Sequence, residues 1–318
     1  MNHDSKIYIA GHTGMVGSAL YKRLKTEGFN KLITATRDQL DLLNQKKTED
    51  FIKNNKPELV ILVAAKVGGI LANSKYPADF LYENLTIQNN IIFSCKEANI
   101  KNLIFLGSSC IYPRNCEQPM KENMLMSGKL EETNKSYAIA KIAGINLCES
   151  ISKQFGLNYF SIMPSNLYGP NDHFDSNLNH VIPALISKFH FAKINNEKKV
   201  DVWGSGNPKR EFLYIDDLID AIMHLIKIDR SELNNVFSKL GSMFLNVGYG
   251  EEIKIKDLVN KIAKLTDFDK EICYDLSMPD GTPKKLLDIS NIKSLGWGPK
   301  TSLDKGLKIT YDWFKQNL

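Results

Sequence analysis

A glycine-rich turn between a short apolar run and an amphipathic segment is the feature that most narrows the folds open to this chain. Residues 6–10 predict a strand, residues 11–17 read Gly-His-Thr-Gly-Met-Val-Gly, and residues 15–26 predict a helix. Glycines permit a tight turn and let the backbone approach a pyrophosphate, which the unpaired N–H groups of a helix N-terminus attract. The pattern alone also fits a plain strand-to-helix turn, but its flanking elements favour a nucleotide site.

The alternation of apolar runs with helix-like segments continues through the first half of the chain. The predicted strands are residues 6–10, 31–36, 59–64, 102–107, 159–163, 200–203, 212–216 and 243–247. The predicted helices are residues 15–26, 48–54, 84–98, 137–155, 182–193, 217–226, 255–265 and 303–316. Strands that are apolar on both faces and alternate with helices imply a parallel sheet covered on both sides. We therefore expect an α/β fold, a Rossmann-type doubly wound parallel sheet with a smaller mixed α/β C-terminal substrate domain.

The regular rhythm fails after Pro164, which indicates two domains interleaved in sequence. We predict a nucleotide-binding domain at residues 1–165 plus about 212–245, and a substrate-binding domain at about 166–211 plus 246–318.

Composition excludes several classes of protein. With 43% hydrophobic and 24% charged residues, the chain reads as a globular enzyme. A net charge of +5 suits the binding of an anionic small molecule. The sequence has no dense basic run of the kind that binds nucleic acid. Five cysteines without a CxxC pair argue against a disulfide framework or a metal site. The most apolar stretch, residues 59–67, contains Lys66 and is too short to span a membrane, so we expect a cytoplasmic protein.

The residues after the second predicted strand bear on the choice of cofactor. An acidic residue there would bind the adenosine ribose and favour NAD, whereas the chain has Thr36-Arg37. The Arg37 guanidinium can pair with a 2′-phosphate, which favours NADP(H). The alternative is that Arg37 is a surface residue and that Asp38 binds the ribose instead.

Tyr137 and Lys141 stand four residues apart at the start of a predicted helix, which puts both side chains on one face. We expect the Lys141 ammonium to lower the phenol pKa, so that Tyr137 gives a proton to a ketone as hydride reaches the carbon. Ser108 follows a buried strand and can bind the same ketone, although a serine there is equally typical of a turn or helix cap. The three residues behind a glycine-rich turn are far more specific than any one of them.

Further motifs cover nearly the whole chain. They are GHTGMVGSAL from Gly11, AAKVGGILAN from Ala64, YPADF from Tyr76, GSSCIYP from Gly107, YAIAKIAG from Tyr137, NLYGP from Asn166, HVIPAL from His180, VWGSG from Val202, REFLY from Arg210 and PDGTPKKLLD from Pro279. With these motifs the sequence resembles the extended short-chain dehydrogenase/reductases, and within them the GDP-L-fucose synthase family.

The resemblance implies NADPH-dependent reduction of the C4 ketone of a GDP-4-keto-sugar after epimerisation at C3 and C5. The family converts GDP-4-keto-6-deoxy-D-mannose to GDP-L-fucose, and we expect this reaction or a close analogue. Inversion of a centre next to a ketone needs a base on one face and an acid on the other, and the resemblance assigns Cys110 and His180. The alternatives are a small buried residue for Cys110 and a loop histidine for His180.

The resemblance also implies individual contacts. The implied cofactor contacts are Gly11, Thr13, Gly14, Met15, Val16, Gly17, Arg37, Asp41, Leu42, Ala64, Ala65, Leu106, Tyr137, Lys141, Pro164, Asn166, Leu167 and His180. The implied substrate contacts are Ser108, Ser109, Cys110, Asn166, Lys188, Trp203, Arg210, Asp280 and Lys284. Two positions depart from the family pattern. Thr13 stands where some members have an arginine, and Lys188 replaces an arginine and loses a bidentate phosphate contact.

Other readings stay open. The chain can be a C4-reductase of a GDP-4-keto-heptose with little or no epimerase activity, or a non-catalytic nucleotide sensor on the same scaffold. Such a sensor usually lacks the tyrosine or the lysine, and both are present here. The resemblance further implies a homodimer, through the helix that starts at Tyr137.

Overall fold

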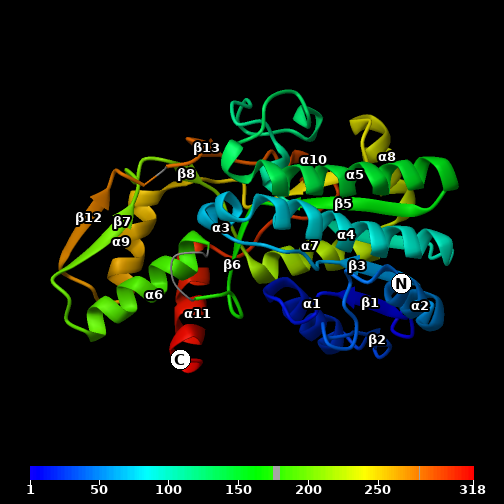
Figure 1. Cartoon of the computed structure of the whole chain (residues 1–318), viewed down its shortest axis with the longest axis horizontal. Coiled ribbons are helices and arrows are strands. Elements are labelled where there is room, and N and C mark those ends of the chain that lie inside the picture. The colour runs from blue at the N-terminus through cyan, green and yellow to red at the C-terminus, as the bar shows by residue number, and fades with distance from the viewer. Residues whose placement is uncertain (175–179, 279) are drawn as a thin grey trace.

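A six-stranded parallel sheet forms the centre of the computed structural model, which describes residues 1–174, 180–278 and 280–318 (Figure 1). Its strand order is β10-β5-β4-β3-β1-β2. The strands are β1 (Ile7–Ala10), β2 (Leu32–Ile33), β3 (Leu59–Leu62), β4 (Asn102–Leu106), β5 (Asn158–Pro164) and β10 (Phe244–Val247). Every residue of β1, β3 and β10 is buried, as strands covered on both faces require. The predicted Rossmann-type fold is confirmed.

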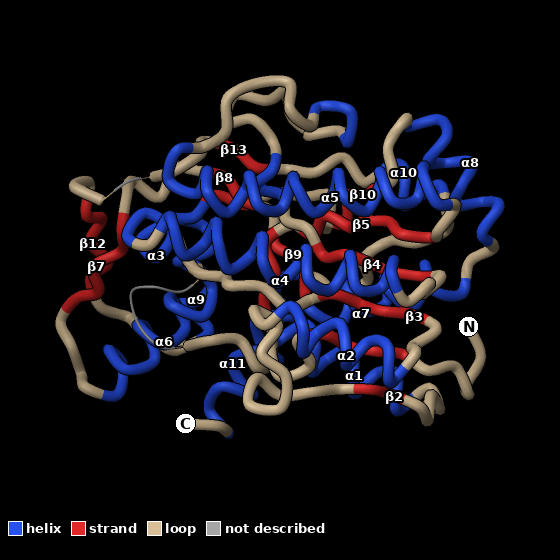
Figure 2. Tube along the Cα trace, turned by 45° about the vertical axis from the view of Figure 1, so that its right-hand side comes forward, coloured by secondary structure: helices blue, strands red, loops and turns tan. Residues whose placement is uncertain are grey.

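Helices cover both faces of this sheet. On one face α2 (Gln45–Asn55), α4 (Pro77–Glu97) and α5 (Lys135–Phe155) pack in a row, and Figure 2 shows α4 and α5 side by side. On the other face α1 (Met15–Thr26) packs against α7 (Ile215–Lys227). The order in which strands are added to the sheet therefore reverses at β1, since β2 lies on one side of β1 and β3 on the other. Ligands bind outside the carboxyl ends of the strands at such a switch point.

Most of the C-terminal elements gather beyond one end of the sheet, toward the left of Figure 1. The helices there are α6 (Val181–Ile194), α9 (Ile255–Leu265) and α11 (Leu303–Gln316). Three small sheets join them. The first has the strands β11 (Ile253–Lys254), β8 (Lys209–Arg210) and β13 (Lys284–Lys285). The second pairs β12 (Glu271–Asp275) with β7 (Lys199–Trp203), and the third pairs β6 (Asn166–Tyr168) with β9 (Phe212–Tyr214). The short helices are α3 (Ile70–Lys75), α8 (Arg230–Leu240) and α10 (Ser290–Ser294), with 3₁₀ turns η1 (Ser109–Ile111), η2 (Glu122–Met124) and η3 (Glu132–Asn134). Of these, α8 and α10 lie at the right of Figure 1, beside α5.

The structure corrects several predicted elements. The second strand covers only Leu32–Ile33 rather than residues 31–36, because this edge strand pairs with β1 over two residues. Helix α4 begins at Pro77 rather than residue 84, with proline at the first helical position, where its missing N–H costs nothing. The strand at 212 ends at Tyr214, and α7 takes over at Ile215. None of the helices in the described part of the chain is both long and apolar enough to cross a membrane.

A buried carboxylate ties the loops next to the sheet together. Glu211, only 1% exposed, lies between β8 and β9. Its Oε1 accepts a hydrogen bond from Gly250 N at 2.6 Å, and its Oε2 accepts one from Leu287 N at 3.0 Å. Both donors belong to loops, so the side chain replaces the secondary-structure partners that these amides lack.

Replacing Glu211 with Ala is expected to lower the free energy of unfolding by about 3 kcal/mol, because two backbone N–H groups lose their acceptor inside the protein. The midpoint of urea unfolding measures this change. Glu251→Ala is the matched control, since Glu251 is exposed and directly follows Gly250 in the same loop. Its removal is expected to leave the midpoint of unfolding unchanged. Equal midpoints for both variants would show that Glu211 does not stabilise the fold.

Candidate active site

One cavity of about 1750 Å³ runs along the carboxyl ends of the main-sheet strands and continues to α6 and β7. It starts at the glycine-rich turn after β1, passes the residues that follow β3, β4 and β5, and ends among the C-terminal elements. This is the edge of the sheet where the switch point predicts a ligand. All residues that the sequence predicts as cofactor contacts line it, and so do all predicted substrate contacts except Lys284.

The glycine-rich turn has room for no side chain at two positions. Gly11 has a φ of +97°, and a Cβ there would lie 2.7 Å from Ala64 N after β3. A Cβ at Gly17 would lie 2.0 Å from Gly11 O. Helix α1 begins just after Gly14, which provides no side-chain cap, so the first N–H groups of the helix have no partner from that residue, and Met15, Val16 and Gly17 line the cavity. The turn therefore fits a pyrophosphate.

Arg37 and Asp38 are now distinguished by position. Both are exposed in the turn after β2, but Arg37 lines the cavity, together with Asp41 and Leu42, and Asp38 does not. The carboxylate of Asp41 accepts a hydrogen bond from Leu43 N at 3.1 Å, which holds this turn in shape. The cation is thus the charged group of the pair that a ligand in the cavity meets.

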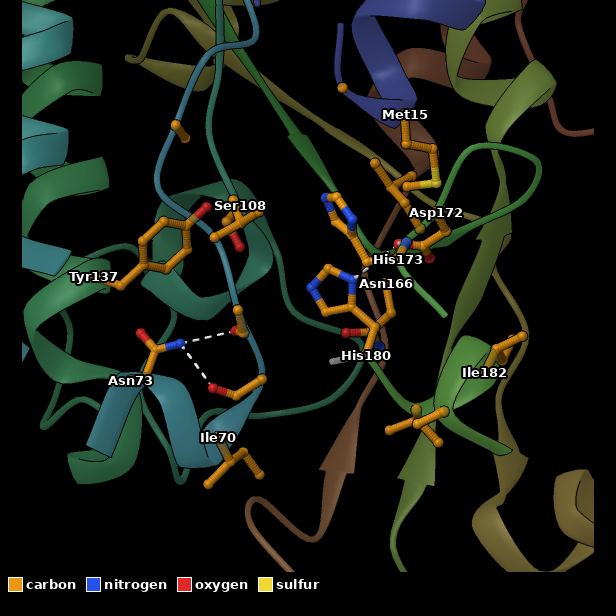
Figure 3. A pocket seen from close by; sticks show the side chains of 18 of the residues that line it. Met15, Ile70, Asn73, Ser108, Tyr137, Asn166, Asp172, His173, His180 and Ile182 are labelled. Atoms are coloured by element: carbon orange, nitrogen blue, oxygen red, sulfur yellow. Dashed lines mark hydrogen bonds and ion pairs between the residues drawn. The ribbon is translucent and has the colours of Figure 1, made fainter. Parts of the chain in front are cut away.

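Tyr137 and Lys141 lie one turn apart on α5, as predicted, and both face the cavity. The Lys141 Nζ lies 5.7 Å from the centre of the Tyr137 ring and donates a hydrogen bond to Leu106 O at 2.8 Å. Ser108 is the N-cap of η1, where its Oγ accepts a hydrogen bond from Cys110 N at 3.4 Å. In Figure 3 the Tyr137 hydroxyl points toward Ser108, with His180 on the opposite side.

The acidity of Tyr137 differs from the sequence-based expectation. Burial raises its pKa far above the usual value near 10, the Cys110 thiol adds to this, and hydrogen bonding with Ser108 opposes it. Burial also lowers the pKa of Lys141 to about 8. The expected lowering of the phenol pKa by the ammonium is therefore wrong for this arrangement, because burial dominates the pKa of the phenol. At neutral pH Tyr137 holds its proton, which is the form that donates to a ketone.

Cys110 and His180 are brought into the same cavity from different elements. The Cys110 thiol is buried in η1, and burial raises its pKa although Lys285 and Lys141 act in the opposite direction. His180 immediately precedes α6, and its side chain is 46% exposed toward the cavity. The pair thus combines a buried thiol with an accessible imidazole.

Three cationic or aromatic side chains line the far end of the cavity. Lys188 on α6 donates a hydrogen bond to Asp201 O at 2.7 Å and lies 5.8 Å from the ring centre of Trp203. Burial lowers the pKa of Arg210 to about 10, so its guanidinium stays charged at neutral pH. Its Nη2 donates to Asp280 O at 3.2 Å. The Asp280 carboxylate accepts from Ser205 N and Ser205 Oγ at 2.7 Å each, which orders the loop after Trp203.

Lys284 lies outside this group, and its neighbour Lys285 lines the cavity instead. Strand β13 pairs with β8 in parallel, with Lys284 opposite Lys209 and Lys285 opposite Arg210. Lys284 and Lys209 share Glu252, at Nζ–O distances of 3.1 and 2.9 Å. Lys285 therefore shares the cavity with Arg210.

Further cavity residues were not predicted from the sequence. The acidic and histidine side chains among them are Glu83, Glu131, Asp172, His173 and Glu197. No periodicity or motif spacing marks them, because Glu83 lies within α4 and the others lie on loops, and only the tertiary structure brings them to the cavity. The described residues contain no group of three His, Cys, Asp or Glu side chains placed to hold a metal ion.

The parallel sheet, the glycine-rich turn and the tyrosine–lysine pair on α5 define a nucleotide-dependent enzyme of the short-chain dehydrogenase type. The model of the NAD dependent epimerase/dehydratase family matches residues 7–238, and the chain belongs to this family.

The chain is similar to enzymes that are named for GDP-linked sugars. The chain is 48% identical to a GDP-L-fucose synthase of Escherichia coli K12 over 313 residues, 98% of this chain and 97% of that one. A solved GDP-6-OMe-4-keto-L-xylo-heptose reductase from C. jejuni superposes with a TM-score of 0.94 at 38% identity, covering 100% and 99% of the two chains. A GDP-mannoheptose C4 reductase from Campylobacter jejuni with NADP bound gives 0.88 at 40% identity, covering 99% of each. The predicted resemblance is confirmed.

Proposed function

We propose that the protein reduces the C4 ketone of a GDP-4-keto-sugar with NADPH after epimerising C3 and C5, converting GDP-4-keto-6-deoxy-D-mannose to GDP-L-fucose or a close analogue. One observation carries the proposal: a single cavity contains the phosphate-binding turn, the Tyr137–Lys141 pair, and Cys110 with His180. Similarity at 48% identity to a GDP-L-fucose synthase over nearly the full length of both chains supports it.

NADP(H) fits the turn side of the cavity. The N–H groups at the start of α1 would hold the pyrophosphate, Arg37 the 2′-phosphate, and Lys141 a ribose hydroxyl. When bound, the cofactor supplies hydride to the ketone carbon. The larger domain, residues 1–165 plus about 212–245, is proposed to hold the cofactor, and the rest of the chain to hold the sugar nucleotide.

Arg37→Gln is expected to raise the KM for NADPH about 10- to 100-fold, because a charge-assisted contact to the 2′-phosphate contributes about 1.5–3 kcal/mol. The KM for NADH, which lacks that phosphate, is expected to change less than about threefold. Initial rates at fixed substrate with each cofactor measure both values. A parallel rise for NADH would mean that Arg37 shapes the turn rather than selects the phosphate.

The far end of the cavity fits the GDP moiety. Lys188 and Arg210 provide cations for its pyrophosphate, and the Trp203 ring provides an apolar face beside them. Lys285 adds a half-buried cation near Cys110 and Arg210. The sugar then lies between this end and Tyr137.

Tyr137 acts as the proton donor of the reduction. Its raised pKa keeps the phenol protonated, and the phenol gives its proton to the C4 oxygen as negative charge develops there. The resulting phenolate lies one helical turn from the Lys141 ammonium, which stabilises it. Ser108, toward which the Tyr137 hydroxyl points, is placed to donate a hydrogen bond to the same oxygen (Figure 3).

Cys110 and His180 exchange the protons at C3 and C5. These C–H bonds are acidic because the C4 ketone delocalises the carbanion as an enolate. Removal on one face and return on the other inverts the centre, and the two groups reach the cavity from separate elements. Proton transfer to carbon balances at each centre, since one proton leaves and one arrives.

A C4-reductase of a GDP-4-keto-heptose is the second candidate function. The TM-score of 0.94 to a GDP-linked heptose reductase favours it. Turnover in D₂O separates the two: deuterium at C3 and C5 of the product supports the epimerase, and its absence leaves only the reductase. NADPH consumption with a panel of GDP-4-keto-sugars identifies the sugar, and the lack of any consumption would point to a non-catalytic nucleotide sensor.

Two further properties belong to this proposal. We expect a homodimer through α4 and α5, where Tyr82, Phe93 and Ile139 are 67%, 50% and 41% exposed. A monomer in light scattering at working concentration would contradict it. The cytoplasm is the proposed compartment, which suits the five cysteines, all of them within the described residues and all free thiols.

A further inference from the structure

Asp172 is a buried carboxylate that the reduction and epimerisation described above do not use. Its side chain is 5% exposed, and it lines the cavity close to His180. Its backbone N–H donates to Gly169 O at 3.4 Å, and its Oδ1 accepts from His173 N at 2.8 Å. The carboxylate is thus held in place by the turn that carries it.

The carboxylate is only partly satisfied. Within the described residues, Oδ2 of Asp172 is buried without a hydrogen-bond partner. Burying a charged oxygen in this way costs free energy unless a partner is supplied, and such groups tend to serve a site. A candidate partner is His180, whose Nδ1 lies 3.9 Å from Asp172 Oδ1, and Figure 3 shows the two side chains next to each other.

We propose that Asp172 is a positioning residue that holds the Nδ1–H of His180 and so assigns proton exchange with the sugar to Nε2. This inference rests on the proposed epimerase function. A neutral imidazole exists as two tautomers, and a carboxylate at one nitrogen selects the tautomer that is protonated there. When Nε2 binds a proton, the same carboxylate stabilises the imidazolium. A contact of 3.9 Å shortens to a hydrogen bond as the substrate complex forms.

Without Asp172, the exposure of His180 would make it a poor group for proton exchange with the sugar. His180 precedes α6 and is nearly half exposed, so water competes for both ring nitrogens. Asp172 comes from an earlier turn, and its buried carboxylate lies on the Nδ1 side of the ring. It therefore fixes the orientation of the ring without blocking the nitrogen that faces the cavity.

Two variants and two reactions test the assignment. Asp172→Asn removes the charge but keeps an acceptor for His173 N, and Asp172→Ala removes both. Deuterium incorporation from D₂O at C3 and C5 reports proton exchange, and oxidation of GDP-L-fucose by NADP⁺ reports hydride transfer alone. We expect incorporation at the His180-dependent centre to fall about 10- to 100-fold in both variants, with hydride transfer within about threefold of wild type.

A spectroscopic readout separates positioning from simple damage. In ¹⁵N-labelled full-length protein, with the His180 signal assigned through His180→Gln, we expect an Nδ1–H tautomer in the wild type and a mixture in Asp172→Ala. Asp217→Asn is the matched control, because Asp217 is a buried acid that accepts from Lys300 N and Thr301 N away from the cavity. It is expected to leave both readouts unchanged.

The outcomes are distinct. Unchanged incorporation in both variants, an unchanged tautomer in Asp172→Ala, or an equal loss of hydride transfer would overturn the positioning role. If the wild type incorporates no deuterium while it still reduces the ketone, the proposed epimerase function is what fails, and the tautomer then decides the role of Asp172.

Discussion

Tyr137→Phe is expected to lower the rate of ketone reduction about a thousandfold while NADPH binding stays within about threefold of wild type. The change removes one oxygen and keeps the ring, whose edge-to-face contact with Phe80 has a centroid distance of 6.2 Å. The lost oxygen is the one that points toward Ser108 and carries the proton (Figure 3). Without it, the oxygen of the ketone gains negative charge with no acid to neutralise it.

Single-turnover decay of NADPH absorbance measures the chemical step, and quenching of intrinsic fluorescence measures cofactor binding. Tyr21→Phe serves as the control, since Tyr21 lies on α1, is partly buried and lies outside the cavity, and the substitution removes the same atom. A variant at position 137 that keeps a tenth of the wild-type rate would show that another group, or water, donates the proton.

The raised pKa of Tyr137 also shows what sequence patterns miss. The spacing of Tyr137 and Lys141 correctly places both on one face of α5, because helix geometry alone fixes it. The sign of the pKa shift depends on burial, and burial depends on how α5 packs against β4 and η1. Local patterns therefore identify the pair, and only the tertiary structure shows which protonation state it adopts.

The fold was predictable wherever local signals were strong. The helices Met15–Thr26, Ile255–Leu265 and Leu303–Gln316 match the predicted bounds, since each has a regular apolar period. The edge strand β2 was predicted too long, because only Leu32 and Ile33 pair with β1, and the apolar Ala35 contacts the core without belonging to the strand. Short segments such as β12 form through pairing with a distant strand, here β7, and give no local signal.

At the site, too, the tertiary structure decides what the sequence leaves open, namely which of the two adjacent lysines of β13 lines the cavity. Sequence alone gives no reason to prefer Lys285 over Lys284, since a two-residue strand has no readable alternation. The register with β8 decides which lysine lines the cavity. Lys284 and Lys209 both form ion pairs with Glu252, and Lys285 shares the cavity with Arg210. Asp172 was missed for a related reason, because its importance comes from its distance to His180 rather than from its place in a motif.

Cys110→Ala is expected to lower deuterium incorporation at C3 or C5 by at least about 100-fold, because the thiol proposed to exchange a proton with the sugar is replaced by a methyl group that cannot. Oxidation of GDP-L-fucose by NADP⁺ is expected to stay within about threefold of wild type, since Tyr137 and Lys141 lie on a different element. The methyl group is close in size to the thiol, so the buried turn η1 keeps its packing.

Mass spectrometry of the product made in D₂O measures incorporation, and absorbance at the reduced nicotinamide band measures oxidation. Cys116→Ala is the control, because Cys116 is half-buried and lies outside the cavity. Loss of both reactions in the Cys110 variant would mean that the residue supports the whole site. Wild-type incorporation in that variant would assign proton exchange to other groups. Because Cys110 and His180 are the two residues proposed to act on the two faces of the sugar, the epimerase proposal would then need a different acid–base pair.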